Sequence, residues 1–278
     1  MHSPTPFALA IFFGILYHIS PVSNQLSIMN NLELEQLINQ KLSSDKINDY
    51  APNGLQVEGK TEIKKIITGV TASQALIDYA ISQNADAILV HHGYFWKSEN
   101  PCIRGMKGKR IKALLVNDIN LYGYHLPLDV HPELGNNAQL AKLLDIENLQ
   151  PLEKSSVSIP VWGELKEPMT GKDFAEKIEK VLNRKPLICI ENGPHLIRKI
   201  GICTGGGQGY IDLAAEQGCD AFITGEVSEQ TIHSAREQGL HFFSAGHHAT
   251  ERYGIKALGE WLAKEYGFDV EFKDIDNP

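Results

Sequence analysis

The sequence predicts an α/β protein made of two similar α/β domains related by an internal repeat. Sliding the chain against itself by 134 positions aligns residues 63–90 with residues 197–224 without a gap, and ten of the aligned positions are identical. Each copy contains an apolar strand, a turn of small residues, a helix with apolar residues at helical spacing, and a second apolar strand. This order is that of a βαβ unit, in which the two strands are parallel and the crossover is right-handed.

The elements of each copy follow in the same order. The first copy predicts strands at 66–70 and 87–90 around a helix that contains Leu76, Ile77 and Ala80. The second predicts strands at 200–204 and 221–224 around a helix that contains Tyr210, Ile211 and Ala214. In both copies a further helix then leads to a strand that ends in a histidine, His125 in the first and His247 in the second.

We expect the domains to span residues 29–135 and 136–278. The boundary between them is soft, because the apolar segment 156–166 fits either sheet and the C-terminal segment has the option of packing back on the first domain. Composition agrees with a globular protein, since 42% of the residues are apolar and 22% are charged.

Residues 1–28 differ from the rest of the chain. The apolar run 6–17 is shorter than the ~20 residues that span a bilayer, and it resembles the core of a signal peptide. No lysine or arginine precedes Lys41, so the basic start of a secretory signal is missing, and Met29 opens an amphipathic helix. We expect an extension outside the fold, arising from a misassigned start, with a targeting or anchoring role as the alternative.

Charge and cysteine content exclude several classes of function. The formal net charge is −8 and no basic cluster offsets it, so tight non-specific binding of nucleic acid is disfavoured. The four cysteines form no C-x-x-C pair, which argues against a zinc knuckle and a disulfide framework. We expect a reduced cytoplasmic protein that does not span or bind a membrane.

Polar residues gather where the predicted strands end. Ligand sites in open α/β sheets lie beyond the carboxyl ends of the strands. The residues predicted to lie there are His91, His92, His125, Asp129, Glu226, His247, His248 and Glu251. The repeat therefore predicts one site built from both halves.

The adjacent histidines His91 and His92 pose a geometric question, because neighbouring side chains of a strand point to opposite faces. We expect Gly93 to permit a backbone turn that brings both rings into one cleft, with each imidazole serving a different ion. A single histidine after a strand is more often a capping or hydrogen-bonding residue than a metal ligand. Two histidines in succession make a ligand role more favourable.

The remaining motifs each allow two interpretations. His247 and Glu251 are four apart and share a helix face, which suits one divalent cation, whereas an ordinary first helical turn is the alternative. Asp129 lies four residues after His125 in a proline-containing loop. This loop either contributes Asp129 to the site or is an ordinary solvated surface loop. The segment 204–209, TGGGQG, has the character of a phosphate cradle but lacks the lysine of a P-loop.

Taken in order, the motifs NGLQV, HHGYFWK, HLPLDVHPELGNN, CTGGGQG, TGEVSEQTIHSAREQG and AGHHATER resemble those of the GTP cyclohydrolase I type 2 homologue family, also called the Ngg-interacting-factor-three-like family. The resemblance runs from about Met29 to the C-terminus and is strongest to short bacterial members without an inserted domain. It implies a toroidal homohexamer of two-domain subunits with a dinuclear divalent-metal site in the cleft between the domains. The implied metal ligands are His91, His92, Asp129, His247 and Glu251.

The resemblance implies the site more firmly than the reaction. Some relatives are credited with opening the ring of GTP, whereas the family as a whole has no settled role. We expect a metal-dependent hydrolase of a nucleotide, phosphoester or related small molecule, with Glu251 and His125 as catalytic residues and His125 as a proton shuttle. Glu251 is expected to bridge two ions, one bound by His92 and Asp129 and the other by His91 and His247.

Mixed nitrogen and oxygen ligands fit Zn, Fe, Mn or Ni equally. Two alternatives to the hydrolase remain open. One is a metal-loaded binding or regulatory scaffold without turnover, and the other is a purely structural metal.

Overall fold

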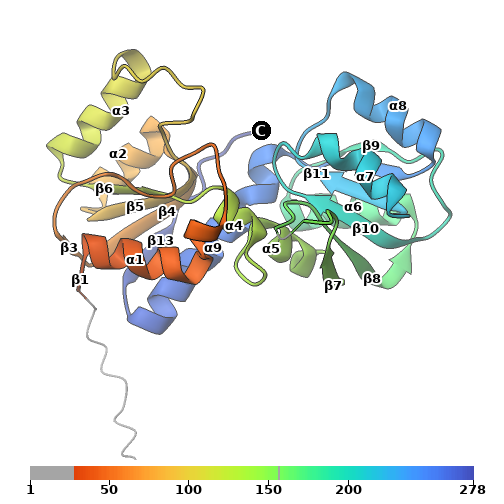
Figure 1. The fold of residues 1–278 in the computed structure, drawn as a ribbon, viewed down its shortest axis with the longest axis horizontal. Coiled ribbons are helices and arrows are strands. Elements are labelled where there is room, and N and C mark those ends of the chain that lie inside the picture. The colour runs from red at the N-terminus through yellow and green to blue at the C-terminus, as the bar shows by residue number, and fades with distance from the viewer. Residues whose placement is uncertain (1–27, 156) are drawn as a thin grey trace, which may run out of the picture.

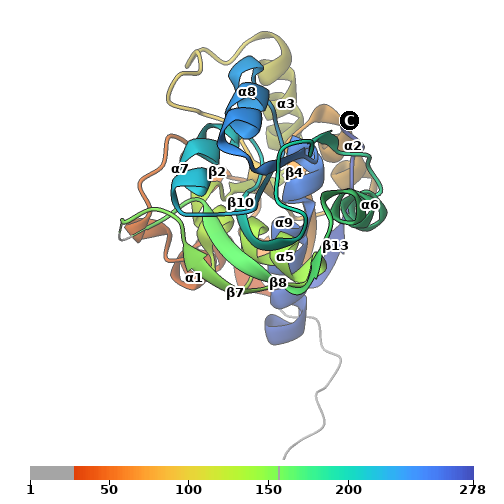
Figure 2. The same cartoon turned by 90° about the vertical axis from the view of Figure 1, so that its right-hand side faces the viewer.

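The computed structural model describes residues 28–155 and 157–278. The extension expected at residues 1–28 therefore lies, except for its last residue, outside the described part of the chain. Figure 1 shows two β-sheets side by side, with helices α4, α5 and α9 between them. The view in Figure 2 looks onto the second sheet and its helices.

The first sheet has five strands in the order β13-β4-β5-β6-β2. Strands β13, β4, β5 and β6 run parallel to one another, and β2 pairs antiparallel to β6 at the edge. Their bounds are β2 Gly54–Val57, β4 Lys65–Thr71, β5 Ala87–His92, β6 Asn120–Gly123 and β13 Asp269–Phe272. A separate two-stranded ladder joins β1 Met29–Asn30 to β3 Glu62–Ile63.

The second sheet has six strands in the order β7-β8-β10-β11-β12-β9. Its central strands β10, β11 and β12 are parallel, and β8, β7 and β9 are added antiparallel. The bounds are β7 Ile146–Pro151, β8 Val161–Met169, β9 Leu187–Cys189, β10 Ile197–Cys203, β11 Ala221–Thr224 and β12 His241–Ser244. Most of the segment 156–166, which fitted either sheet from the sequence, thus contributes to β8 of the second sheet.

The internal repeat is visible in the hydrogen bonds of both halves. Asp86 Oδ2 accepts the backbone N–H groups of Lys64 and Lys65, at 2.8 Å each. Asp220, 134 positions later, accepts those of Arg198 and Lys199 at 2.9 Å each. These aspartates hold the start of the first repeat strand to the start of the second, which explains why this part of the motif is identical in both copies.

Helices cover both faces of each sheet. On the first sheet, α1 Asn31–Leu42 and α9 His247–Tyr266 pack on one face, and α2 Gln74–Ser82 and α3 Gly105–Val116 on the other. On the second sheet, α5 Asn136–Leu143 and α6 Gly171–Leu182 oppose α7 Ile211–Glu216 and α8 Glu229–Gln238. The short elements are α4 Leu126–Val130 and the 3-10 turns η1 Ser44–Lys46 and η2 Gln208–Tyr210.

The C-terminal segment crosses back to the first sheet. Helix α9 starts directly after β12 of the second sheet, yet its buried residues Ile255, Leu258 and Leu262 belong to the core of the first sheet. Strand β13 then pairs in parallel with β4. This return matches the packing that the sequence left open for this segment, while the domain limits 29–135 and 136–278 remain predictions.

Within the described residues, no helix has both the length and the apolar character needed to cross a bilayer.

Candidate metal centre

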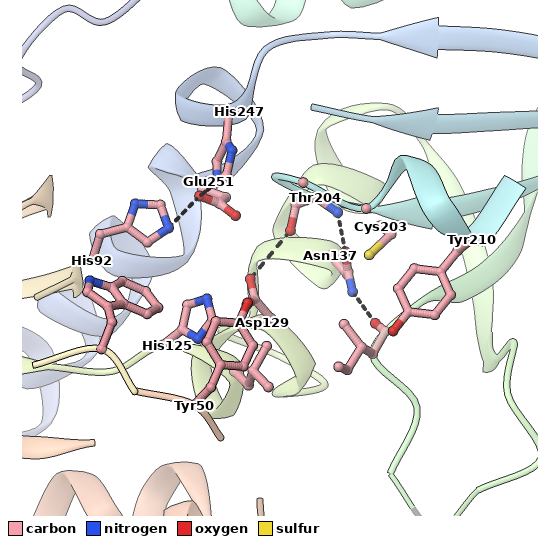
Figure 3. A pocket seen from close by; sticks show the side chains of 15 residues that line it. Tyr50, His92, His125, Asp129, Asn137, Cys203, Thr204, Tyr210, His247 and Glu251 are labelled. Carbon is pink, nitrogen blue, oxygen red and sulfur yellow. Dashed lines mark hydrogen bonds and ion pairs between the residues drawn. The ribbon is translucent and has the colours of Figure 1, made fainter. Parts of the chain in front are cut away.

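The polar side chains predicted at the strand ends converge between the two sheets. Strand β5 ends in His91 and His92, Asp129 lies on α4 just after β6, and the first turns of α9 carry His247 and Glu251. Figure 3 shows His92, Asp129, His247 and Glu251 turned toward one cleft. These five residues, His91, His92, Asp129, His247 and Glu251, are called the ligand cluster below.

Glu251 lies at the centre of the ligand cluster. Its Oε2 is 3.2 Å from His92 Nε2 and 3.2 Å from His247 Nε2. Its Oε1 is 3.6 Å from His91 Nε2, which in turn lies 3.5 Å from Asp129 Oδ1. Two of the three groups of potential ligand atoms share this carboxylate, His92–His247–Glu251 and His91–Asp129–Glu251, and the third is His91–His92–His125.

This grouping differs from the one expected from the sequence, where His92 was paired with Asp129 and His91 with His247. Glu251 belongs to both groups, as a bridging carboxylate would, and its bridging of two ions remains a prediction. His91 and His92 have swapped partners relative to that expectation because of the fold. His91 is fully buried beside α4, whereas His92 is partly exposed and its ring centre lies 5.3 Å from that of His247.

Each histidine of the ligand cluster is oriented by a partner at Nδ1. His91 Nδ1 is 2.9 Å from the carbonyl oxygen of Tyr124, and His92 Nδ1 is 3.2 Å from Thr71 Oγ1. His247 Nδ1 is 2.6 Å from Glu226 Oε1. When Nδ1 donates to an oxygen, the lone pair remains on Nε2, which is the arrangement typical of metal-binding histidines.

One oxygen of the buried Glu251 carboxylate lacks a hydrogen-bond donor within the described part of the chain. Glu251 is only 3% exposed, and its Oε2 has no hydrogen-bond donor among the described residues. A buried, unsatisfied carboxylate oxygen is costly unless a cation neutralises it. The ligand cluster thus fits a divalent cation, which would take the nitrogen and oxygen atoms that face one another here.

The pKa values of the cluster reflect the same need for positive charge. Burial opposes a charge on His91, but the Asp129 and Glu251 carboxylates outweigh it and raise the pKa of His91 to about 9. Burial similarly opposes a charge on His247, and Glu251 and Glu226 raise its pKa to about 9. Burial and the charge of His91 lower the pKa of His92 to about 4. Without a metal, two protons therefore balance the acids, and binding a metal would release them.

The two acids respond differently to the cluster. Burial raises the pKa of Asp129. Burial also opposes the charge of Glu251, but His91 and the other surrounding histidines hold the pKa of this carboxyl well below its usual range. Glu251 is thus the more strongly anionic of the two, as its central position requires.

Asn136 fixes Asp129 in place from the first turn of α5. Its Nδ2 donates to Asp129 Oδ1 at 2.8 Å, and its Oδ1 accepts the backbone N–H of Gly254 on α9 at 3.1 Å. The neighbouring Asn137 bridges the halves as well, since its Oδ1 accepts the N–H of Thr204 at 2.9 Å. Asn136 and Asn137 appear in the sequence as a plain NN pair after a glycine, and nothing in the residue types indicated this role.

His125 lies beside the ligand cluster and is held by an aspartate. Its ring centre is 5.2 Å from that of His91, and its Nδ1 is 2.9 Å from Asp49 Oδ1. Asp49 Oδ2 also accepts the N–H of Leu126 at 2.8 Å. Asp49 could not be recognised from the sequence, because it comes from an irregular segment more than seventy residues before His125.

The predicted strand-end residue His248 and the nearby His131 do not reach the ligand cluster. His248 Nε2 lies 2.7 Å from Asp274 Oδ1 near the C-terminus. His131, which stands near the ligand Asp129 in the sequence, instead accepts the N–H groups of Glu133 and Leu134 through Nδ1. Both histidines thus have local structural partners.

Two glycines shape the centre in ways that differ from the sequence expectations. Gly93 does not have a positive φ, and the carboxamide of Gln56 fills the space that a Cβ would take there. Strand β5 continues through His92, so the pair is not brought together by a left-handed turn at Gly93. In the segment 204–209, Gly205 has φ of +65°, and a Cβ on it would overlap the Glu251 carboxylate.

The phosphate cradle considered for segment 204–209 finds little support. The N–H of Gly205 donates to Thr250 Oγ1 at 3.0 Å, and that of Gly207 donates to Thr224 Oγ1 at 3.1 Å. Two of the amides that would hold a phosphate are therefore already satisfied within the protein.

An open cleft of about 520 Å³ leads to the ligand cluster. Tyr50 and His125 of the first half line one side, where Trp96 packs against both of their rings. Tyr210 and Cys203 of the second half lie across from Tyr50 and His125 (Figure 3). The volume is typical of a site for a small molecule. A metal ion held by the ligand cluster would thus be accessible to a small molecule.

Comparison with known proteins gives consistent matches over the same residues. Residues 29–278 match the family model described as Duf34/NIF3 (NGG1p interacting factor 3). A Haemophilus influenzae protein named GTP cyclohydrolase 1 type 2 homolog is 98% identical over 250 residues, which cover 90% of this chain and 100% of the relative. A protein of the same name from Escherichia coli (strain K12) is 64% identical over the same shares of both chains.

Solved structures agree with the fold. One described as protein ybgI, of unknown function, is 64% identical and superposes with a TM-score of 0.87, covering 90% of this chain and 100% of that one. TTHA1606 from Thermus thermophilus is 32% identical with a TM-score of 0.80, covering 90% of this chain and 99% of that one.

Proposed function

The chain belongs to the Duf34/NIF3 family, and from this premise we propose that it is a dinuclear divalent-metal protein that hydrolyses a nucleotide or a related small molecule. The relatives named after GTP cyclohydrolase motivate the substrate class. The residues that carry the proposal are those of the ligand cluster, with His125 beside them.

The single observation that supports two ions best is the position of Glu251. Each of its oxygens faces a different set of ligand atoms, Oε1 toward His91 and Oε2 toward His92 and His247. A carboxylate shared in this way is typical of metal pairs that activate water, and it leaves coordination positions for substrate. A closed structural site would instead use all its positions for protein ligands.

Two divalent ions supply Lewis acidity and lower the pKa of a bound water. The protein's own contribution is to orient the groups around them. Thr71, Glu226 and the carbonyl of Tyr124 fix the three histidine rings, and Asn136 fixes Asp129. The Asp49 carboxylate holds Nδ1 of His125, so that its Nε2 is free to accept or return a proton at the cleft.

Metal analysis of protein purified without chelators tests this proposal. We expect about two divalent ions per chain, and loss of both in Glu251→Gln, which keeps the size of the side chain and removes its charge. Glu260→Gln is the matched control, because Glu260 lies on the exposed side of the same helix. Protein that contains no metal would refute the proposal.

Turnover is then measured on GTP, other nucleotides and phosphoesters, with both variants alongside. We expect metal-dependent hydrolysis that Glu251→Gln abolishes and Glu260→Gln retains. Metal binding without any turnover would instead favour the metal-loaded scaffold.

We also propose the ring-shaped homohexamer and the cytoplasmic location that the family resemblance implies. Light scattering coupled to size exclusion is expected to give a mass six times that of one chain. A monomer in that measurement would contradict the ring.

A further inference from the structure

We propose that the cleft recognises a flat heteroaromatic ring, of the nucleobase or nucleoside class, and makes no use of a polyphosphate tail. This inference rests on the proposed function, because it concerns the substrate of the same site. It follows from the side chains of the cleft, which among the described residues offer aromatic surface and no lysine or arginine.

The first half of the cleft presents an aromatic wall made of Tyr50, Trp96 and His125. The ring centres of Tyr50 and Trp96 lie 5.8 Å apart. Both rings stand nearly edge-on to His125, with centres 5.0 Å and 4.9 Å from it. Tyr210 lies on the opposite side of the cleft (Figure 3), so an inserted ring would meet aromatic surface on both sides.

Hydrogen bonds fix the loops that carry the aromatic wall, although the wall faces solvent. Tyr50 is 54% exposed, although its ring contacts Trp96 and His125. Its backbone carbonyl accepts the N–H of Lys97, and the indole N–H of Trp96 donates to the carbonyl of Gly93 at 3.2 Å. The two loops are therefore tied together and present their rings in a fixed arrangement, which lowers the entropic cost of stacking a ligand.

The charges around the cleft argue against a polyphosphate. No lysine or arginine side chain lines the cleft within residues 28–155 and 157–278. Its lining contains the acids Asp129 and Glu251 beside the histidines His92, His125 and His247, and Glu226 adds a further carboxylate next to His247. Sites for polyphosphates place arginine, lysine or free backbone amides around the anion.

The proposed ions do not remove this difficulty. Two divalent ions bound by two carboxylates leave roughly two positive charges, which suits one phosphate group or one ring oxygen but not a triphosphate. The amides of Gly205 and Gly207 are already bonded to Thr250 and Thr224. A triphosphate would therefore extend from the cleft without a charged partner in this chain.

Calorimetry on metal-loaded protein tests the proposal with guanosine, guanosine monophosphate, GTP and inorganic tripolyphosphate as probes, in excess Mg²⁺ so that the phosphates do not strip the site. We expect guanosine and its monophosphate to bind at least as tightly as GTP, and tripolyphosphate not to bind in the cleft. GTP binding more than about tenfold tighter than guanosine would overturn the proposal. So would an absence of guanosine binding.

Variants of the aromatic wall test independently whether its rings bind guanosine. Tyr50→Leu and Trp96→Leu are each expected to weaken guanosine binding about tenfold, because stacking on an aromatic ring is lost. Tyr50→Phe keeps the ring and is expected to retain the affinity. Trp261→Leu is the control, since Trp261 packs against Tyr266 away from the cleft. Unchanged affinity in both leucine variants of the wall would overturn the proposal.

Metal analysis on the same samples separates this inference from the proposed function. Protein without metal that still binds guanosine through Tyr50 and Trp96 would refute the dinuclear hydrolase and leave the ring-binding cleft. Metal-loaded protein that binds GTP more than about tenfold tighter than guanosine would refute the ring-binding inference and leave the dinuclear hydrolase.

Discussion

Replacing Asp49 by asparagine is expected to destabilise the protein in a way that depends on pH. Asp49 is 3% exposed at its side chain, and it accepts hydrogen bonds from His125, Leu126 and Asn53 at 2.9, 2.8 and 3.0 Å. Burial opposes its charge, but the hydrogen bonds from His125 and Asn53 outweigh it and lower the pKa of Asp49 from 3.8 to about 2. The folded state therefore favours the charged carboxylate.

The magnitude follows from this difference in pKa. A change from 3.8 to about 2 is equivalent to roughly 2 kcal/mol of stability. Asparagine keeps a carbonyl oxygen that can still accept a hydrogen bond, so we expect Asp49→Asn to lose about 1–2 kcal/mol at pH 7. A lowered folded pKa stabilises above the unfolded value of 3.8, so the loss is full at pH 7, about half as large at pH 3, and nearly absent below the folded pKa.

Urea unfolding of the wild type and of Asp49→Asn at pH 7 and pH 3 measures the two differences. Asp45→Asn is the control, because Asp45 is an exposed aspartate in the 3-10 turn η1, four residues before Asp49. We expect the control to change the free energy of unfolding by less than about 0.5 kcal/mol at either pH. A difference for Asp49→Asn that is equally large at both pH values would refute the assigned role of its charge.

Three further predictions concern the metal centre. Glu226→Gln is expected to lower the affinity for the ion bound through His247 about 10- to 100-fold in a chelator competition, because a weaker acceptor at Nδ1 no longer fixes the ring. Unchanged metal affinity would contradict this prediction. Gly205→Ala is expected to lower both metal affinity and the urea midpoint, because its Cβ would overlap Glu251 at a positive φ, whereas Gly209→Ala meets no atom within 4 Å and serves as the control. Removing the metal with a chelator at pH 7 is expected to lower the melting temperature but leave the far-UV circular dichroism intact, since extensive apolar cores hold each sheet; complete loss of structure would favour a structural metal.

The parts of the fold that could be predicted are those that depend on local sequence patterns. The repeat was visible because Asp86 and Asp220 perform the same hydrogen-bonding task in both halves and are therefore the same residue type. Parallel strands then force the strand-end histidines to one edge of each sheet. The positions of His91, His92 and His247 follow from these local patterns alone.

The parts that could not be predicted depend on contacts between distant segments. Asp49 reaches His125 from an irregular segment without periodicity, and Asn136 joins Asp129 to Gly254 through its side-chain amide. Asparagine and aspartate are common in turns, so their types gave no signal for these roles. The pairing of His92 with His247 also depends on how the two sheets face each other, which no local pattern encodes.

Helix α9 explains how a site between two halves keeps its geometry. The helix begins at His247, next to β12 of the second sheet, and further along it the buried side chains Ile255 and Leu258 pack on the first sheet. Glu251 lies between these two attachments, so a rotation of one half against the other must bend α9 or break its packing. Because the hydrogen bond from Gly254 to Asn136 pins the same part of the helix to α5, the carboxylate is held at a fixed distance from both histidine sets. The arrangement thus favours a preorganised metal centre over one that assembles only when the halves close on a ligand.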